Sequence, residues 1–185
     1  MRPLNFLALG LLYIGAAAAG ALVFPPGQPI TVPSWKIQSS AEAGEDLAAL
    51  SQPDVDTTSW HHVDASKCTL MGCLIEAGVY SDDELFYSDN LRRFNASAFH
   101  VPWLYRHDFR LARRLPGRHY FLQTHGITSR ADIYLNGKEV ANKTVQAGAY
   151  AGRKYDITGL VDKDNALVIR VYPTDYNYDF ALGRW

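Results

Sequence analysis

The sequence predicts a mainly β fold, an antiparallel β-sandwich or jelly roll with only short helical turns. From residue 103 onward, short strand-like runs follow one another with turn signals between them, which is typical of antiparallel sheets. No strand–helix–strand alternation appears, so a parallel sheet is not expected. Tyrosine is abundant, with 11 copies beside 8 Phe and 4 Trp, and aromatic side chains favour strands.

Four runs carry the strand prediction. Residues 105–111 place Tyr, His, Phe and Leu at one parity and charged residues at the other, as in a half-buried strand. Residues 119–124 contain a contiguous Tyr-Phe-Leu run, which indicates burial on both faces. Residues 131–140 form a predicted hairpin around Asn136-Gly137, because both positions tolerate positive φ. Residues 166–172 alternate with period two.

The first third of the chain is less regular. We expect residues 22–34 to be an extended, Pro-rich lead-in, with the first strand inside residues 30–38. Residues 41–50 predict a short helix, and residues 69–78 predict one or two helical turns that end at the glycine.

The N-terminus carries the pattern of a signal peptide over residues 1–21. Arg2 supplies a positive start, residues 4–24 contain no charge, and the small residues at 17–21 suit a signal peptidase. An uncleaved membrane anchor is the competing interpretation, because the apolar run is long enough to span a bilayer. The Ala- and Gly-rich second half favours cleavage. We therefore expect a secreted, extracellular protein whose folded domain occupies residues 35–185.

Two tripeptides match the acceptor sequence for N-linked glycosylation, Asn95-Ala96-Ser97 and Asn142-Lys143-Thr144. Such tripeptides also arise by chance, so neither one alone establishes a glycan. Asn142 follows the predicted hairpin, where exposure is expected, and it is the stronger candidate of the two.

Cys68 and Cys73 are the only cysteines, and a disulfide between them is expected in an oxidising compartment. In a regular α-helix, residues five apart are separated by about 7.5 Å along the axis, beyond the limit of about 6.8 Å between bridged Cα atoms. The segment must therefore turn, with Gly72 as the accommodating residue. Two buried free thiols are the alternative, and a two-cysteine metal site lacks companion ligands.

Composition and motifs exclude several classes of function. The formal net charge is −1 with both signs interspersed, so no nucleic-acid partner is expected. A Gly-x-Ser-x-Gly nucleophile motif and a phosphate-binding loop are absent, and we expect no cofactor. His61-His62 would face opposite sides of a strand, so we expect no metal site there. The run Asp82-Asp83-Glu84 is expected to be a solvated loop, a poor environment for the raised pKa of a glycosidase acid.

The segment from Gly126 to Lys138 reads Gly-Ile-Thr-Ser-Arg-Ala-Asp-Ile-Tyr-Leu-Asn-Gly-Lys. It resembles a stretch of the N-terminal domain of family-two glycoside hydrolases, G-I-x-S-x-A-x-[IV]-x-[LV]-N-G. The resemblance covers residues 35–185, and β-mannosidases and β-galactosidases share the scaffold. The exo-β-D-glucosaminidase branch is the most similar, in the order and spacing of residues 35–40, 78–80, 86–91 and 102–106.

The resemblance implies a galactose-binding-like jelly roll that packs against a later (β/α)₈ barrel, with an immunoglobulin-like domain between them. In the family, the barrel holds the general acid and the nucleophile. A barrel typically needs about 250 residues, so no catalytic residue is assigned to this chain. The family's segment after its last strand runs toward the active-site rim. This makes Asp175, Asp179 and Trp185 the candidates for a sugar-facing edge.

The expected function is that of a non-catalytic domain of a secreted enzyme that removes terminal glucosamine from chitosan oligosaccharides. Its partners would be an amino-sugar oligosaccharide and the missing immunoglobulin-like and barrel domains, with no membrane partner after signal cleavage. The alternatives are a free-standing carbohydrate-binding module, a relative of the β-mannosidase type, and a structural sandwich without a sugar ligand.

Four side chains invite a functional interpretation. Trp103, Tyr105 and Arg106 could form a sugar platform, because aromatic faces stack on pyranose rings. We expect instead that Trp103 and Tyr105 fill the core and that Arg106 forms a surface ion pair, since large aromatic side chains are mostly placed by burial. Arg130 is expected to make an interdomain or structural contact rather than to bind a ligand.

Overall fold

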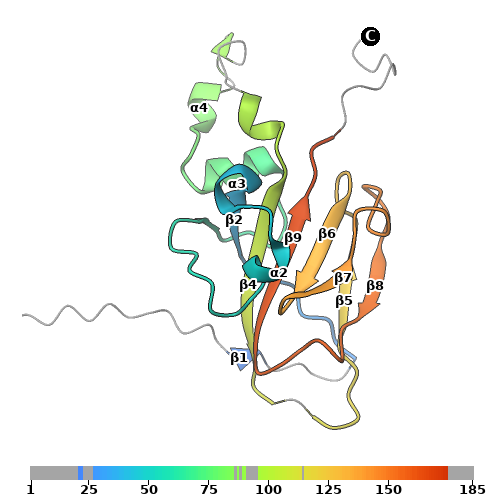
Figure 1. Cartoon of the computed structure of the whole chain (residues 1–185). Helices are drawn as coiled ribbons and strands as arrows, with labels where there is room; N and C mark the ends of the chain where they lie inside the picture. Colours follow the sequence, from blue (N-terminus) through green and yellow to red (C-terminus); the bar gives the residue numbers. More distant parts are fainter. Residues whose placement is uncertain are drawn as a thin grey trace, which may run out of the picture.

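The computed structural model describes residues 21–22, 27–85, 87, 89–90, 96–113 and 115–174 of the 185-residue chain. Two sheets pack together, with short helices beside one end of the larger sheet (Figure 1). The predicted mainly antiparallel β fold with few helices is confirmed. In chain order the elements are β1 (Ala21–Leu22), β2 (Trp35–Ser39), α1 (Ser40–Ala43), α2 (Leu47–Leu50), β3 (His61–Val63), α3 (Leu70–Glu76), α4 (Asp82–Leu85), the 3₁₀ turn η2 (Ala96–Phe99), β4 (Trp103–Leu111), β5 (Phe121–Thr124), β6 (Ala131–Leu135), β7 (Lys138–Ala141), β8 (Arg153–Asp156) and β9 (Asp164–Val171).

The larger sheet has the strand order β3-β2-β4-β9-β6-β7. Strands β4 and β9 form its centre and pair antiparallel from Trp103 opposite Val171 to Arg110 opposite Asp164. The short strand β1 pairs with β4 outside this path, and it is parallel to β4, whereas the other described pairs are antiparallel. Strands β5 and β8 form a separate two-stranded sheet. The last described strand, β9, therefore lies in the middle of the larger sheet.

The predicted hairpin at Asn136-Gly137 is confirmed. Strand β6 ends at Leu135 and β7 begins at Lys138, and the two residues between them have φ values of 51° and 79°. The Asn136 side chain also ties this turn to β9, because its Oδ1 accepts from the backbone N–H of Ala166 at 2.9 Å. The turn thus sets the register of β7 and contacts the beginning of the central strand.

Two local expectations in the first third need correction. The strand expected within residues 30–38 is shorter, because β2 begins only at Trp35 and ends at Ser39. The predicted helix over residues 41–50 is instead two single turns, α1 and α2, because Gly44 adopts a φ of 94° and ends α1. The Asp46 carboxylate then caps α2 by accepting from the backbone N–H of Ala49 at 3.0 Å.

Two further expectations differ in the middle of the chain. Burial of residues 119–124 on both faces is wrong, because Phe121 on β5 is 48% exposed. Strand β5 belongs to the outer two-stranded sheet, so one of its faces meets solvent, and the Lys154 ammonium lies 4.2 Å from the centroid of the Phe121 ring. The acidic run that begins at Asp82 forms the helical turn α4 instead of a loop, although Asp82 and Asp83 are exposed as expected.

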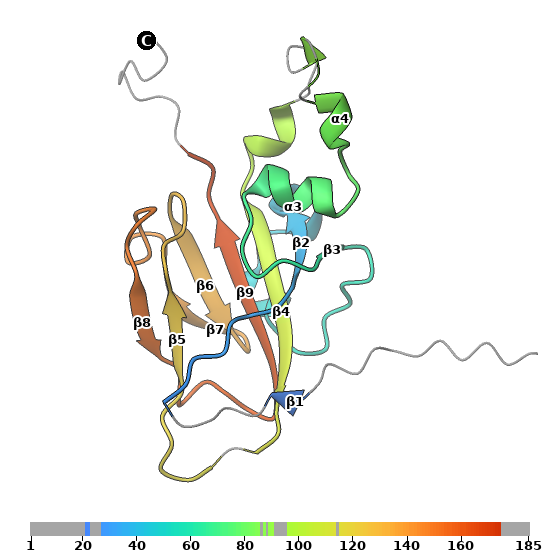
Figure 2. The ribbon, with the colours of Figure 1, turned by 180° about the vertical axis from the view of Figure 1, so that it is seen from behind.

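Apolar side chains form three buried clusters that hold the layers together. The first fills the space between the two sheets, where Leu122 of β5 and Tyr155 of β8 pack against strands of the larger sheet. The second lies beneath α3, which stands before the sheet in Figure 2, and the third lies beneath α1 and α2 on the opposite face, where Figure 1 shows α2. Their buried members are Leu111, Ala131, Ile133, Leu135, Ala141, Ile157, Val161, Leu167 and Ile169; Ile37, Val63, Cys73, Leu74 and Trp103; and Leu47, Leu104 and Val168.

A disulfide joins Cys68 to Cys73, with 5.6 Å between the two Cα atoms, and the predicted pairing is confirmed. The turn that permits it lies at Thr69, whose Oγ1 accepts from the backbone N–H of Gly72 at 3.1 Å and caps α3. Cys68 precedes this cap and only Cys73 is helical, so Gly72 is an ordinary helical residue rather than the accommodating one. The helix ends before Gly78, which adopts a φ of 73°, as predicted.

The Arg106 side chain is wholly buried at 0% exposure, which corrects the expectation of a surface ion pair. Its Nη1 donates to the carbonyl oxygen of Leu50, and its Nη2 donates to that of Gln52 at 2.8 Å. Its Nε donates to Oδ1 of Asp108 at 2.8 Å, so a carboxylate on the same strand compensates the charge. The guanidinium therefore holds the end of α2 and the following turn against β4.

Replacing Arg106 by Met should lower the free energy of unfolding by about 3–5 kcal/mol, because the change removes the buried guanidinium that donates to Asp108 and to the carbonyl oxygens of Leu50 and Gln52. The matched control is Arg110→Met on the same strand, where the ion pair with Asp164 is about half exposed. That control should cost no more than about 1 kcal/mol. Urea unfolding of the three proteins measures the difference, and equal midpoints for the two variants would refute the anchoring role.

Gly126 should not tolerate a side chain. Its φ is +125°, and a Cβ atom built there would lie 2.0 Å from the carbonyl oxygen of Ala149. Gly126→Ala should therefore lower stability by at least about 2 kcal/mol. Gly159→Ala is the control, since no heavy atom lies within 4 Å of its built Cβ and its φ is not positive. Thermal unfolding of both variants tests this, and an unchanged midpoint for Gly126→Ala would contradict it.

Candidate functional site

Several candidates from the sequence lie outside the described residues. These are the rim candidates Asp175, Asp179 and Trp185 and the acceptor Asn95. The structure therefore neither supports nor contradicts their assigned roles. The described residues form two surface hollows, several ion-paired carboxyl groups and a buried polar cluster that can be compared with the needs of a sugar-binding or catalytic site.

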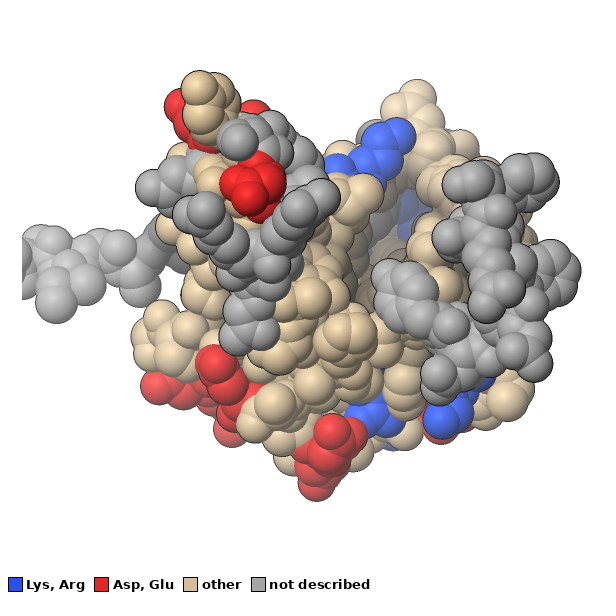
Figure 3. Space-filling model, turned by 90° about the horizontal axis from the view of Figure 1, so that it is seen from above, with Lys and Arg blue, Asp and Glu red and all other residues tan. Residues whose placement is uncertain are grey.

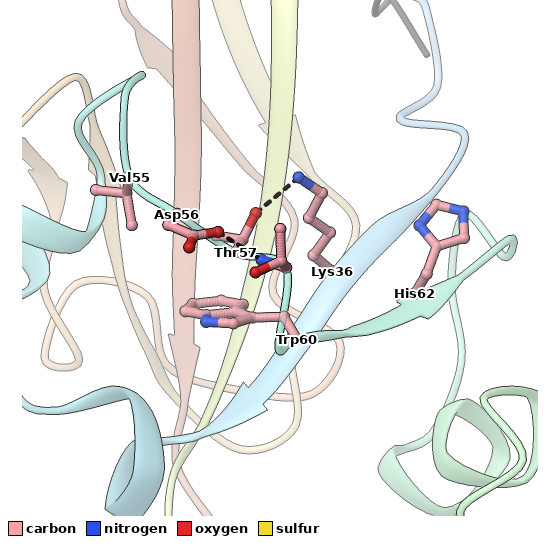
Figure 4. Close-up of a pocket in the computed structure, with 7 residues that line it drawn as sticks. Lys36, Val55, Asp56, Thr57, Trp60 and His62 are labelled. Carbon is pink, nitrogen blue, oxygen red and sulfur yellow. Dashed lines mark hydrogen bonds between the residues drawn. The ribbon is translucent and has the colours of Figure 1, made fainter. Parts of the chain in front are cut away.

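One hollow lies on the α2 side of the larger sheet and has a volume of about 480 Å³. Lys36 of β2 and His62 of β3 line it together with Trp60 and residues 55–58 of the loop before β3. Figure 4 shows Lys36 reaching toward Thr57, while His62 stands apart on its strand. Trp60 is half-buried and packs against the third apolar cluster, so only part of its ring reaches the hollow.

Hydrogen bonds fix the polar groups of this hollow. The Lys36 ammonium donates to Thr57 Oγ1 at 2.7 Å and to Oδ2 of Asp108 at 3.3 Å. The Asp56 carboxylate accepts from the backbone N–H of Thr58 at 2.9 Å. Bonds from the backbone and hydroxyl of Thr58 lower the pKa of Asp56. The hollow therefore presents an ammonium, a carboxylate and part of an aromatic ring, which are groups that suit a hydroxylated ligand.

Hydrolysis of a glycosidic bond needs more than this hollow provides. A retaining glycosidase uses two carboxyl groups about 5–5.5 Å apart, one of which has a raised pKa. Asp56 is the one carboxylate among the described residues that line the hollow, and its pKa is lowered. The pKa of Asp156 is also lowered, through hydrogen bonds from the hydroxyl and backbone of Thr158.

A second hollow of about 410 Å³ is lined by three carboxylates, Asp54, Asp108 and Asp164. Asp108 and Asp164 each bind an arginine. Asp108 pairs with Arg106 at 2.6 Å, and Asp164 pairs with Arg110 at 2.5 Å. Both carboxylates are therefore engaged in ion pairs within the domain. The pKa of Asp132 is lowered like those of Asp56 and Asp156, whereas the acid of a glycosidase needs a raised pKa.

A buried polar cluster at the end of β9 was not predicted from the sequence. Oδ2 of Asp132 accepts from the Tyr172 hydroxyl at 2.6 Å and from Nη2 of Arg170 at 2.8 Å. Arg170 also pairs with Glu45 at 2.6 Å, and Oδ1 of Asp132 accepts from the backbone N–H of Lys143 at 2.7 Å. The cluster thus joins β6, β9 and two loops at the point where the chain leaves the sheet.

Hydrogen bonds and burial together shift the pKa values of Asp132 and Tyr172 in this cluster. Burial alone would raise the pKa of Asp132, but hydrogen bonds from Tyr172 and Arg170 outweigh it and leave the pKa lowered. Burial and the bond to Asp132 raise the pKa of Tyr172 to about 12, so its hydroxyl remains a donor. The one signal in the sequence was the alternation of β9, which puts Arg170 on the same face as the buried Val168.

The proposed aromatic platform belongs to the core. Trp103 is 6% exposed, and its Nε1 donates to the carbonyl oxygen of Ala98 at 2.7 Å. Tyr105 packs within two apolar clusters, and burial raises its pKa to about 12. Arg130 is exposed, and its backbone bridges to Ala147. These aromatic residues therefore fill the core as expected, and Arg130 contributes a structural backbone contact.

Metal binding, membrane crossing and nucleic-acid binding find no support in the described part of the chain. Among those residues, no group of three or more His, Cys, Asp or Glu side chains is placed to hold a metal ion. No described helix is long and apolar enough to cross a membrane. Seen from above, acidic and basic side chains form small separate groups among uncharged residues (Figure 3).

Residues 35–179 match the family model described as glycosyl hydrolase 2 galactose-binding domain-like. The chain belongs to this family. The match begins where β2 begins, and it includes both sheets, the disulfide and the two hollows. The expected galactose-binding-like sandwich from a family-two glycoside hydrolase is thereby confirmed.

Relatives within the family are much longer than this chain. An exo-β-D-glucosaminidase from Hypocrea virens is 53% identical over 180 residues, which are 95% of this chain and 20% of the relative. An exo-β-D-glucosaminidase from Amycolatopsis orientalis is 36% identical over 173 residues, which are 93% of this chain and 15% of the relative. The chain thus spans about a fifth or less of the length of these curated relatives.

Solved structures agree with this placement. The crystal structure of an exo-chitosanase from Amycolatopsis orientalis superposes with a TM-score of 0.71 at 36% identity, covering 78% of this chain and 16% of that one. A β-D-mannosidase from Dictyoglomus thermophilum gives a TM-score of 0.55 at 20% identity, covering 75% of this chain and 15% of that one. The second likeness shows the shared fold alone.

Acidification should weaken the fold through His107. Burial lowers its pKa below 6.5, and Nδ1 lies 2.9 Å from the carbonyl oxygen of Ser34. Because the folded state then binds fewer protons than the unfolded state, stability is complete above about pH 6.5 and declines as the pH falls below it. His107→Asn should reduce the difference in urea midpoint between pH 7.5 and pH 5.5, whereas His125→Asn, at an exposed position, should preserve it. An undiminished difference in His107→Asn would contradict this assignment.

Proposed function

We propose that this chain serves as the N-terminal domain of a secreted exo-β-D-glucosaminidase that removes terminal glucosamine from chitosan oligosaccharides. The observation that carries the proposal is the 53% identity to such an enzyme across 95% of this chain, which corresponds to 20% of the enzyme. The remaining length of that relative is several times the size of this domain. The reacting carboxylates are accordingly assigned to another part of the full-length protein.

The carboxyl groups of this domain support a non-catalytic role. Asp108 and Asp164 are bound by arginine side chains, and Asp132 accepts bonds from three donors. Hydrogen bonds lower the pKa of Asp132, whereas the acid of a glycosidase must hold its proton near neutral pH. These groups therefore stabilise the domain instead of acting on a substrate.

The polar cluster at the end of β9 supports a positioning role. Asp132 holds Arg170 and Tyr172 together, which fixes the path of the chain as it leaves the central strand. Because residues 170–172 are held in place, the chain that follows β9 starts from a defined position and direction. In the proposed enzyme, this exit determines how the domain is placed relative to the part that carries the reaction.

A chimeric enzyme tests the proposal. The corresponding fifth of the Hypocrea virens exo-β-D-glucosaminidase is replaced by this chain, and release of glucosamine from chitosan oligomers is measured. The chimera should release glucosamine, whereas this chain alone should release none. The control is a chimera that carries Asp132→Ala, which should have lower activity because the chain exit loses its anchor.

Four outcomes would count against the proposal. Turnover by this chain alone would show that its carboxyl groups are catalytic, and a folded but inactive chimera would break the link to glucosaminidases. Activity of the chimera on an aryl mannoside but not on the aryl glucosaminide would favour the β-mannosidase type. Calorimetric binding of chitosan oligomers to the isolated chain, lost on Trp60→Ala, would favour a free-standing carbohydrate-binding module, because Trp60 lines the hollow in Figure 4.

A further inference from the structure

Strand β7 forms an edge of the larger sheet. It pairs with β6 on one side, and no other described strand pairs with it. Such an edge presents free backbone N–H and C=O groups that can pair with a strand of another molecule. Lys138 and Glu139 on this strand are exposed charged residues, which discourage such pairing. No other described strand covers this edge of β7.

Asn142 follows this edge strand directly and begins the acceptor tripeptide with Lys143 and Thr144. Its Oδ1 accepts from the backbone N–H of Thr144 at 3.1 Å, from Thr144 Oγ1 at 2.5 Å and from the backbone N–H of Val145 at 3.3 Å. Its Nδ2 donates to Oε1 of Glu139 at 3.3 Å. The side chain is thus held in one orientation, with the amide oxygen turned toward the acceptor tripeptide.

The amide nitrogen of Asn142 has one hydrogen that is not used in a hydrogen bond to the described residues. An asparagine amide carries two hydrogens, and Asn142 uses one of them with Glu139. The second has no partner among the described residues. Asn136 provides the contrast, because its Nδ2 donates to both Leu160 and Asn165 and sits within the fold. Asn142 itself is half-buried, but Lys143, Thr144 and Val145 beside it are exposed, so a group attached at Asn142 would extend past them into solvent.

We propose that Asn142 carries an N-linked oligosaccharide that covers the open edge of β7. In the transfer, a secretory-pathway enzyme of the host supplies an oligosaccharide linked to a lipid through diphosphate. A bond forms between Nδ2 of Asn142 and the anomeric carbon, and the bond from that carbon to the diphosphate oxygen breaks. The lipid diphosphate leaves, and one amide proton is released. The other amide hydrogen remains available to Glu139.

The position of Asn142 would place the oligosaccharide beside the edge of β7. Asn142 lies one residue beyond the end of β7, so a bulky, hydrated group there would stand beside the unpaired backbone of that strand. It would also shield Val145, an apolar side chain that is 48% exposed and whose backbone N–H contacts Asn142 Oδ1. The inference rests on secretion of the chain, which is part of the proposed function.

The test is expression of the full chain in a glycosylating yeast, followed by mass spectrometry of the peptide that contains Asn142. In protein from the medium, this peptide should carry a glycan, and peptide-N-glycosidase should convert Asn142 to Asp. Thr144→Ser should remain glycosylated because serine preserves the acceptor sequence, whereas Thr144→Val and Asn142→Gln should be unmodified.

The outcomes separate this inference from the proposed function. An unmodified Asn142 in secreted chain would overturn the glycosylation and leave the proposed function standing. An unmodified chain retained inside the cell would overturn secretion, and the glycosylation with it. For the covering role, light scattering should show greater self-association of secreted Thr144→Val than of wild type, with Asn95→Gln as the control for loss of the other acceptor. Equal association of Thr144→Val and wild type would overturn that role.

Discussion

The guanidinium of Arg106 can lie within the protein because three acceptors converge on it. Two are carbonyl oxygens of the turn after α2, and the third is the carboxylate of Asp108. A buried charge with fewer partners would favour unfolding, so the position of that turn is linked to the position of Asp108 on β4. The layer formed by α1, α2 and residues 51–60 depends on this link. Ser51, in the same layer, is wholly buried and accepts from the backbone N–H of Gly137 at 2.9 Å, which extends the contact to the hairpin.

Local patterns in the sequence predicted much of the fold. The Asn136-Gly137 turn, the ending of α3 at Gly78 and the alternation of β4 and β9 each follow from the conformational preferences of a few neighbouring residues. The disulfide also followed from spacing and compartment, although the turn that allows it lies at Thr69.

What the sequence could not predict depends on contacts between distant segments. Arg106 looked like a surface residue because alternation shows which residues share a face and does not show what covers that face. Phe121 looked buried because a contiguous apolar run does not reveal that its strand belongs to a small outer sheet. The cluster of Asp132, Arg170 and Tyr172 joins β6 to residues about forty positions later, so the alternation of β9 could place Arg170 on a buried face but could not indicate Asp132 as its partner.

The place of β9 in the sheet has a consequence for synthesis of the chain. This strand is the last of the described part, yet it lies between β4 and β6 and pairs with both along most of its length. While the ribosome is still making residues 164–171, strands β4 and β6 have no partner in the middle of the sheet. The domain therefore cannot close progressively from its N-terminus, and its apolar faces remain open until this segment emerges. A nascent chain of this kind would be a substrate for chaperones up to that moment.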